Sequence, residues 1–342
     1  MVELEYIQDK NMTEDYQSLL KEYHGERYPK FVKRQNWYKQ YSDYRVLLAR
    51  LDGKPIGQSC AYKVPAMFKG EPIEIWWGVD SFVLSSARGH GIGKKLQKKL
   101  HEDLPHFSSA WYSPTNGHIK KKCGANELAD LRFCYYPVSS FFCPFLFLVT
   151  KKLFGKGLRL NMRLPYFYSG LNGFCRSHKG FVFKEMKSAD FNQSFYDSLA
   201  EMLSDKSFYV KRDKHFFETK YFSNPELKYH AFSVYKNDVM QGFFAFTEVK
   251  DMQWVLASVK GIKMLDAIIR PGSGLTQRDI LLSIARYYKQ RKMTLDGILS
   301  LQDADYYPRY AYPHPSTPLL TTIASEKLHD AYVSYIDQDM EH

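Results

Sequence analysis

Residues 88–93, with the sequence Arg-Gly-His-Gly-Ile-Gly, have the clearest capacity for chemistry in this chain. A strand pattern ends just before them at Val83, and a helix pattern follows, in which Ile92, Leu96 and Leu100 recur every four residues. A glycine-rich turn between a strand and a helix leaves the first backbone N–H groups of the helix unpaired, and the helix dipole favours an anion there. The stretch therefore predicts a binding site for a phosphate or pyrophosphate group.

Spacing distinguishes between the known kinds of glycine loop. A P-loop needs four residues between its glycines and then Lys-Ser/Thr, whereas Gly89 and Gly93 have three between them and Lys95 stands where the hydroxyl is needed. The dinucleotide fingerprint needs Gly-x-Gly-x-x-Gly, but the glycines here are each two apart. Three glycines would also suit a tight turn that binds nothing, since glycine accepts positive φ without steric cost. The pattern that fits is Arg-x-x-Gly-x-Gly, formed by Arg88, Gly91 and Gly93.

This pattern resembles the coenzyme A signature of the GNAT superfamily of N-acetyltransferases. The expected elements of about the first 135 residues also follow the GNAT order of strand, helix, hairpin, strand, loop, helix, strand and helix. The resemblance implies an α/β (α+β) fold with a mixed, mostly antiparallel sheet flanked by helices, and acetyl-CoA as acyl donor, entering between the fourth and fifth strands. The coenzyme-binding residues that it implies are Phe82, Val83, Leu84, Arg88, Gly89, His90, Gly91, Ile92, Gly93, Lys94 and Asn116.

The same order of elements recurs in the second half of the chain. A strand and a helix near residues 181–202 are followed by a hairpin at 229–249, where Gly242 stands as Gly57 stands in the first hairpin. The loop at 270–278 lacks Arg-x-x-Gly-x-Gly, so we expect the first half to bind the coenzyme and the second half to have another task, such as shaping the acceptor groove or supporting the fold. Such a long repeat predicts two tandem GNAT-like domains. Their expected limits are 1–140 for the domain with the signature, 141–180 for a connector and 181–342 for the degenerate domain.

The central strand carries a carboxylate, Asp80, beside the glycine loop. Strand alternation assigns Val79, Ser81 and Val83 to one face and Asp80, Phe82 and Leu84 to the other. GNAT enzymes often place a base on this strand, so the resemblance implies that Asp80 takes the proton lost by the attacking amine, a contribution of roughly 10²- to 10⁴-fold. A structural role as a hydrogen-bond acceptor fits Asp80 equally well.

The proton donor for the departing thiolate is less evident. GNAT enzymes often use a tyrosine after the fifth strand, and counting back four from Gly124 reaches Lys120 instead. The usual tyrosine is therefore missing, and the nearby substitutes are Tyr112 and His118. Each of them fits a structural role better than a catalytic one.

The composition indicates the cellular compartment of the protein and the class of partner that it binds. Five cysteines without a Cys-x-x-Cys pair predict reduced thiols and no metal site, and together with the absence of a signal peptide they favour a cytoplasmic protein. The formal net charge of +11 suits nucleic acid, anionic lipid or a phosphorylated small molecule. Because basic residues gather beside the glycine loop, we expect coenzyme phosphates as the partner and no nucleic acid.

Residues 141–149 form an apolar run that is followed by Lys151, Lys152 and Lys156. One interpretation is peripheral contact with a membrane, in which the apolar run enters the interface and the lysines after it contact anionic headgroups. Burial between the two halves is the interpretation we favour, since the run is short and a tandem fold needs an apolar seam.

Three classes of function fit these residues. The first is an N-acyltransferase that moves an acetyl or other acyl group from coenzyme A to a primary amine of a small molecule, for example an amino sugar. The second is a Fem-type aminoacyl transferase, which also has tandem GNAT-like halves but uses charged tRNA. The third is a catalytically silent binding protein. The intact signature favours the first, whereas the missing tyrosine and the degenerate second half favour the third.

Overall fold

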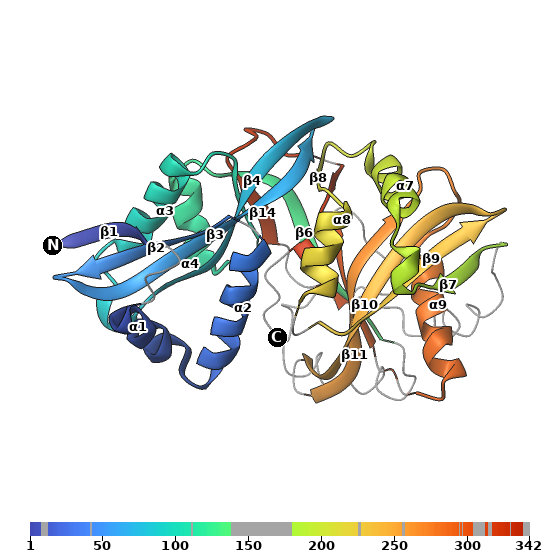
Figure 1. The fold of residues 1–342 in the computed structure, drawn as a ribbon, viewed down its shortest axis with the longest axis horizontal. Helices are drawn as coiled ribbons and strands as arrows, with labels where there is room; N and C mark the ends of the chain where they lie inside the picture. Colours follow the sequence, from blue (N-terminus) through green and yellow to red (C-terminus); the bar gives the residue numbers. More distant parts are fainter. Residues whose placement is uncertain are drawn as a thin grey trace, which may run out of the picture.

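The computed structural model describes residues 1–337 except 8–12, 42, 111, 138–179, 225–226, 255–256, 294, 296, 304–311, 314–316 and 329. The apolar run at 141–149 and the basic residues after it lie outside the described residues. The two halves of the chain lie side by side, each with a strongly twisted sheet and helices packed against it (Figure 1). Among the helices of the described ranges, none combines the length and apolar character that crossing a membrane requires.

The first half begins with an antiparallel meander. Its strands are β1 (Val2–Ile7), β2 (Tyr44–Leu51), β3 (Lys54–Phe68) and β4 (Glu71–Val83), and they pair in that order. The predicted turns at Asp52-Gly53 and Lys69-Gly70 are confirmed, with positive φ at all four residues. Helices α1 (Glu14–His24) and α2 (Tyr28–Tyr41) cover one face of this sheet. Helix α3 (Ile92–Asp103), which packs beside α4 (Pro114–Lys122), covers the other (Figure 1).

The second half repeats this arrangement, as predicted. Its elements are β7 (Val182–Glu185), α7 (Gln193–Leu203), β8 (Phe208–Val210), α8 (Lys214–Phe217), β9 (Tyr229–Lys236), β10 (Val239–Trp254), β11 (Ala257–Ile269), α9 (Gln277–Gln290) and β12 (Gly297–Asp303). The repeat extends to single residues. Gly57 pairs with the last residue of β4, and Gly242 pairs with the last residue of β11. A Cβ at Gly57 would lie 2.7 Å from the Phe82 carbonyl oxygen, and one at Gly242 would lie 2.9 Å from that of Ile268. Glycine is therefore needed at both positions because the neighbouring backbone is so close.

The two halves exchange strands. Strand β6 (Asn126–Pro137) belongs to the first half by sequence, yet it pairs antiparallel with β12 of the second half. Strand β14 (Thr317–Thr321), from near the C-terminus, inserts between β5 (Phe107–Ser109) and β6. One sheet therefore runs through both halves in the order β1-β2-β3-β4-β5-β14-β6-β12-β11-β10-β9-β7. Short strands add to it: β13 (Tyr312–Pro313) pairs with β6, while β8 pairs with β3 and with β15 (Ala331–Tyr332).

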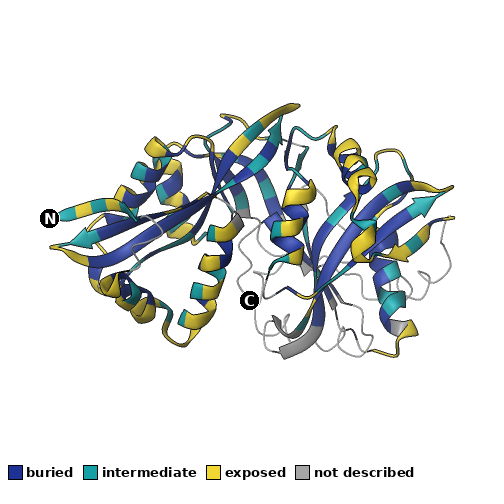
Figure 2. Ribbon diagram, viewed as in Figure 1, coloured by how far each residue is buried: buried dark blue, intermediate teal, exposed yellow. Residues whose placement is uncertain are grey.

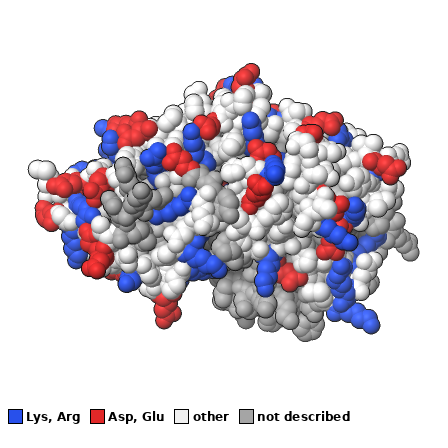
Figure 3. Space-filling model, in the orientation of Figure 1, with Lys and Arg blue, Asp and Glu red and all other residues white. Residues whose placement is uncertain are grey.

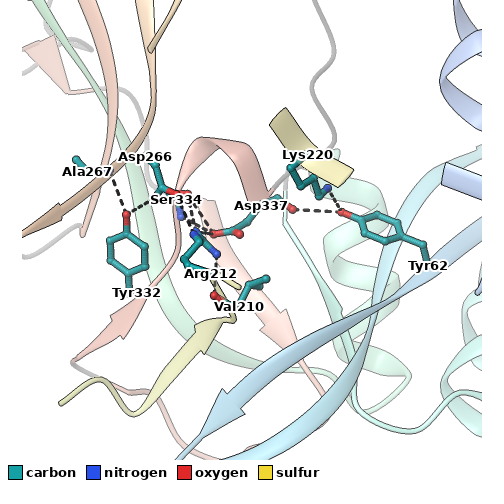
Figure 4. A network of polar contacts seen from close by, with 9 residues as sticks. All are labelled: Tyr62, Val210, Arg212, Lys220, Asp266, Ala267, Tyr332, Ser334 and Asp337. Carbon is teal, nitrogen blue, oxygen red and sulfur yellow. Dashed lines mark hydrogen bonds and ion pairs between the residues drawn. The ribbon is translucent and has the colours of Figure 1, made fainter. Parts of the chain in front are cut away.

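The central strands of both halves are buried along most of their length, and the outer helix faces are exposed (Figure 2). A buried ionic network lies near the seam (Figure 4). Arg212 donates through Nε to Asp266 Oδ2 at 2.8 Å and through Nη2 to Asp337 Oδ2 at 2.7 Å, and all three side chains are fully buried. Lys220 Nζ donates to the hydroxyl of Tyr62 in β3 at 2.7 Å. Polar contacts thus tie the second half to the first.

Candidate coenzyme and acyl-transfer site

Strands β4 and β5 separate soon after they meet. Their parallel pairing comprises Trp76 with Phe107 and Trp77 with Ser108, while β4 continues to Val83. Gly78 follows the last pair, and a Cβ there would lie 2.4 Å from the Phe107 ring, so glycine lets this ring pack against β4. Beyond this point a cavity of about 980 Å³ opens between the two strands, α3 and α4.

A bulge in β4 shapes the wall of this cavity. The pairing of β3 with β4 shifts between Gln58–Phe82 and Cys60–Val79, and Asp80 has a positive φ of 47°. The predicted alternation is therefore wrong here: Val79 and Phe82 pack in the same hydrophobic cluster instead of on opposite faces. An extra residue at a bulge shifts every side chain after it to the other face.

The glycine loop forms the turn into α3, as predicted. Gly89 and Gly91 have φ of 90° and 70°, values that suit glycine, and Gly91 is the N-cap residue of α3. No side chain of the described residues caps this helix. Arg88 and Lys94 line the cavity beside the loop. An uncapped helix N-terminus with two neighbouring cations is a physically suitable site for phosphate groups.

The cavity brings together most of the predicted site residues. It is lined by Asp80, Phe82, Val83, Arg88, Gly89, Gly91, Ile92, Gly93, Lys94, Tyr112 and Asn116. Three others do not line it: Leu84 is buried in the core, whereas His90 and His118 are exposed. Of the two substitutes for the missing tyrosine, Tyr112 is therefore the better placed. Its hydroxyl donates to the carbonyl oxygen of Pro318 at 2.7 Å, and burial raises its pKa.

Asp80 is held by a partner that the sequence did not reveal. Its Oδ1 accepts a hydrogen bond from Arg34 Nη2 of α2 at 2.6 Å, and 3% of the Asp80 side chain is exposed. The two residues are far apart in the sequence, so no local pattern could connect them. An adjacent guanidinium favours the ionised form of a carboxylate.

Lys120 is the most unusual residue of the site. It is 2% exposed and lines the cavity, and its Nζ donates to Ser109 Oγ at 2.7 Å. Nζ lies 5.0 Å from the centre of the Phe107 ring and 5.9 Å from that of Tyr112. Burial lowers the pKa of Lys120 to about 7. From the sequence, Lys120 was noted only as the position where the usual tyrosine is missing. Its burial had one local signal: it follows Gly117 by three residues, so the two buried residues lie on one face of the helix.

Helix α1 also contributes to the site. Tyr23 and His24, at its C-terminal end, line the cavity together with Gln58 of β3. The Tyr23 ring stacks on Phe82 with centroids 3.7 Å apart, and burial lowers the pKa of His24 to about 4. No motif marked these residues, because their helix reads from the sequence as an ordinary amphipathic element.

Comparisons with known proteins agree with this geometry. Residues 11–112 match the model of the acetyltransferase (GNAT) family. A GCN5-related N-acetyltransferase from Anabaena variabilis has 12% identity and a TM-score of 0.59, over 93% of this chain and 72% of that one. A tandem GNAT protein from the clavulanic acid biosynthesis pathway has 11% identity and a TM-score of 0.52, over 93% and 98%. N-myristoyltransferase from Saccharomyces cerevisiae, with bound myristoyl-CoA, has 13% identity and a TM-score of 0.54, over 99% and 85%.

No curated protein matches the chain. The fold is that of the tandem GNAT proteins, with the Arg-x-x-Gly-x-Gly loop at the edge of the gap between β4 and β5. The part of the chain that matches the acetyltransferase (GNAT) family model, residues 11–112, contains this loop.

Proposed function

We propose that this protein is an acyl-CoA-dependent N-acyltransferase that transfers an acetyl or related acyl group to the primary amine of a small molecule, an amino sugar being one candidate. The observation that supports it best is the position of Arg88, Gly91 and Gly93. They line one wall of a cavity that opens where β4 and β5 separate. The same cavity holds ionisable side chains that could move protons.

The coenzyme phosphates would bind at the N-terminus of α3, beside Arg88 and Lys94. The rest of the donor would follow β4, whose residues after Trp77 make no pairs with β5. Backbone N–H groups of a strand without a neighbour can donate to the amides of the donor or polarise its thioester carbonyl. The gap between the strands thus supplies backbone hydrogen-bond donors, whatever side chains line it.

The distribution of positive charge along α3 suits an acyl donor that carries phosphate groups. On α3, Lys98 and Lys99 form ion pairs with Glu102 and Asp103 of the next turn, whereas Lys94 lines the cavity. Positive and negative side chains are interspersed over the face seen in Figure 3. The cavity end of α3 thus keeps its positive charge, while the positive charge farther along the helix is balanced locally.

In the proposed reaction the amine nitrogen attacks the thioester carbonyl carbon, and the C–S bond breaks as the C–N bond becomes an amide. Asp80 would attract the ammonium form of the acceptor and receive the proton that the nitrogen loses. Its pairing with Arg34 keeps it ionised for the first of these tasks. Trp77 and Phe82, which flank Asp80 along β4 and line the cavity, would contact the apolar part of the acceptor.

Calorimetric titration with acetyl-CoA, coenzyme A and ATP tests the donor. We expect saturable binding of both coenzyme forms, weakened roughly 10- to 100-fold by Arg88→Ala through loss of a charge-assisted phosphate contact. Lys98→Ala is the matched control, because it removes a charge from α3 outside the cavity lining. Binding in this pattern would justify a screen of primary amines, including glucosamine, for release of free thiol. Absence of binding to either coenzyme form would overturn the proposal.

A further inference from the structure

Lys120 is a buried cation without a described counter-ion. Its Nζ donates a hydrogen bond to Ser109 and lies over the rings of Phe107 and Tyr112, but no carboxylate of the described residues forms an ion pair with it. Arg212, buried to a similar degree, is by contrast held between two carboxylates. Burying an ammonium group without a counter-ion opposes folding, and an apolar side chain would serve the fold better. A lysine in this position therefore indicates a role in chemistry.

The position of the amine is defined by the strand gap. Ser109 ends β5, directly after Ser108, which makes the last pair with β4. Lys120 Nζ therefore lies where the two strands begin to separate, with the rings of Phe107 and Tyr112 beside it. The glycine loop borders the same cavity. A donor whose phosphates sit at α3 and whose thioester follows β4 would bring its sulfur toward this amine.

We propose that Lys120 is the proton donor for the coenzyme A thiolate that leaves during acyl transfer, a role that rests on the proposed function. As the C–S bond breaks, its electron pair goes to sulfur, and the sulfur takes a proton from the Lys120 ammonium to give the free thiol. Asp80 has received the proton that the acceptor nitrogen lost, and the neutral Lys120 amine regains a proton through water as Asp80 releases it. The chain thereby carries out with a lysine the step for which the expected tyrosine is missing.

The surroundings of Lys120 suit this step. An acid works best when its pKa lies near the working pH, and burial brings that of Lys120 to about 7. The Ser109 hydroxyl oxygen accepts one of the three N–H bonds of the ammonium and fixes its direction, which leaves two N–H bonds for the cavity. The neighbouring rings exclude water from its flank.

The first test needs no acceptor. Thiolate absorbance is measured against pH to follow the ionisation of the coenzyme A thiol. The coenzyme is bound in turn to the wild type, to Lys120→Met and to Lys122→Met. Lys122 is an exposed lysine on the same helix and serves as the control. An ammonium and a thiolate that lie side by side stabilise each other and titrate as a pair. We therefore expect the thiolate to form at a lower pH in the wild type than in Lys120→Met, while Lys122→Met leaves the titration unchanged.

The outcomes separate the two proposals. If all three proteins bind coenzyme A and share one thiol pKa, Lys120 does not face the sulfur and this inference fails, while the proposed function stands. If the wild type does not bind coenzyme A, the proposed function fails and this inference with it. Calorimetry on the same samples distinguishes these cases.

Turnover provides a second measurement once an acceptor amine is known. Lys120→Met should lower kcat with acetyl-CoA by roughly 10²- to 10⁴-fold, and much less with an acetyl thioester of a nitrothiophenol, whose thiolate leaves without a proton. A structural role would lower the rate with both donors alike. Equal losses would therefore overturn the assignment.

Discussion

Replacing Lys120 by methionine should stabilise the protein, and the gain should depend on pH. In the folded state burial holds the pKa of Lys120 at about 7, against an ordinary value of 10.5. Between these values the unfolded chain binds more protons than the folded one, so the penalty of burial is complete below pH 7 and disappears as the pH rises toward 10.5. Linkage gives a penalty of about 4 kcal/mol at pH 7 and about 2 kcal/mol at pH 9.

Methionine is close to lysine in shape and carries no charge, so Lys120→Met removes the whole penalty. The lost hydrogen bond to Ser109 opposes this gain by about 1 kcal/mol. The variant should therefore be about 3 kcal/mol more stable than the wild type at pH 7 and about 1 kcal/mol more stable at pH 9. Other titrating groups are common to both proteins and cancel in the difference.

Urea unfolding of both proteins at pH 6, 7, 8 and 9 measures this difference, with the exposed Lys122→Met as a control that should change little. A gain in stability that accompanies a loss of catalysis is typical of a residue retained for function. A variant less stable than the wild type at pH 7, or a difference that does not vary from pH 6 to 9, would refute the view of Lys120 as a buried cation without a counter-ion among the described residues.

Two further predictions concern the other ionic groups. Asp80→Asn should lower turnover roughly 10²-fold or more while coenzyme A affinity stays within about twofold, because the amide cannot take the proton of the acceptor; an unchanged rate against pH would exclude Asp80 as the base. Arg212→Met should cost about 3–5 kcal/mol of stability in urea at pH 7, because Asp266 and Asp337 would be left buried without their guanidinium. This loss should shrink at pH 5, since burial already raises the pKa of Asp266 and protonation removes its charge; a loss independent of pH would contradict the reasoning.

The sequence predicted the features that depend on local patterns. Turn signals at Asp52-Gly53 and Lys69-Gly70, the end of the central strand at Val83 and the glycine loop all lie where expected. The internal repeat was predicted as well, including the equivalence of Gly57 and Gly242, because each must let a neighbouring backbone approach. These features need only a few consecutive residues to be recognised.

Features that depend on distant partners were not predicted. The insertion of β14 between β5 and β6 joins segments about 200 residues apart, and no spacing within either segment encodes it. The bulge at Asp80 was missed because alternation alone assumes an unbroken register. The ion pair of Asp80 with Arg34 and the burial of Lys120 likewise follow from packing. The local elements that surround the site were therefore easier to predict than its electrostatics.

Because β14 pairs with β5 and β6, the proposed donor site depends on a segment that is synthesised long after the glycine loop. Strand β5, which presents Ser109 to Lys120, is held on its outer side by the C-terminal segment. Ser108 Oγ lies 2.9 Å from Thr321 Oγ1, and Phe107 N donates to Thr322 Oγ1 at 2.9 Å. A nascent chain thus contains the Arg-x-x-Gly-x-Gly loop long before the strand that completes this wall of the gap has been made. The wall of the proposed site becomes complete only when residues 317–322 have left the ribosome, so products truncated before them carry the glycine loop without the neighbour of β5.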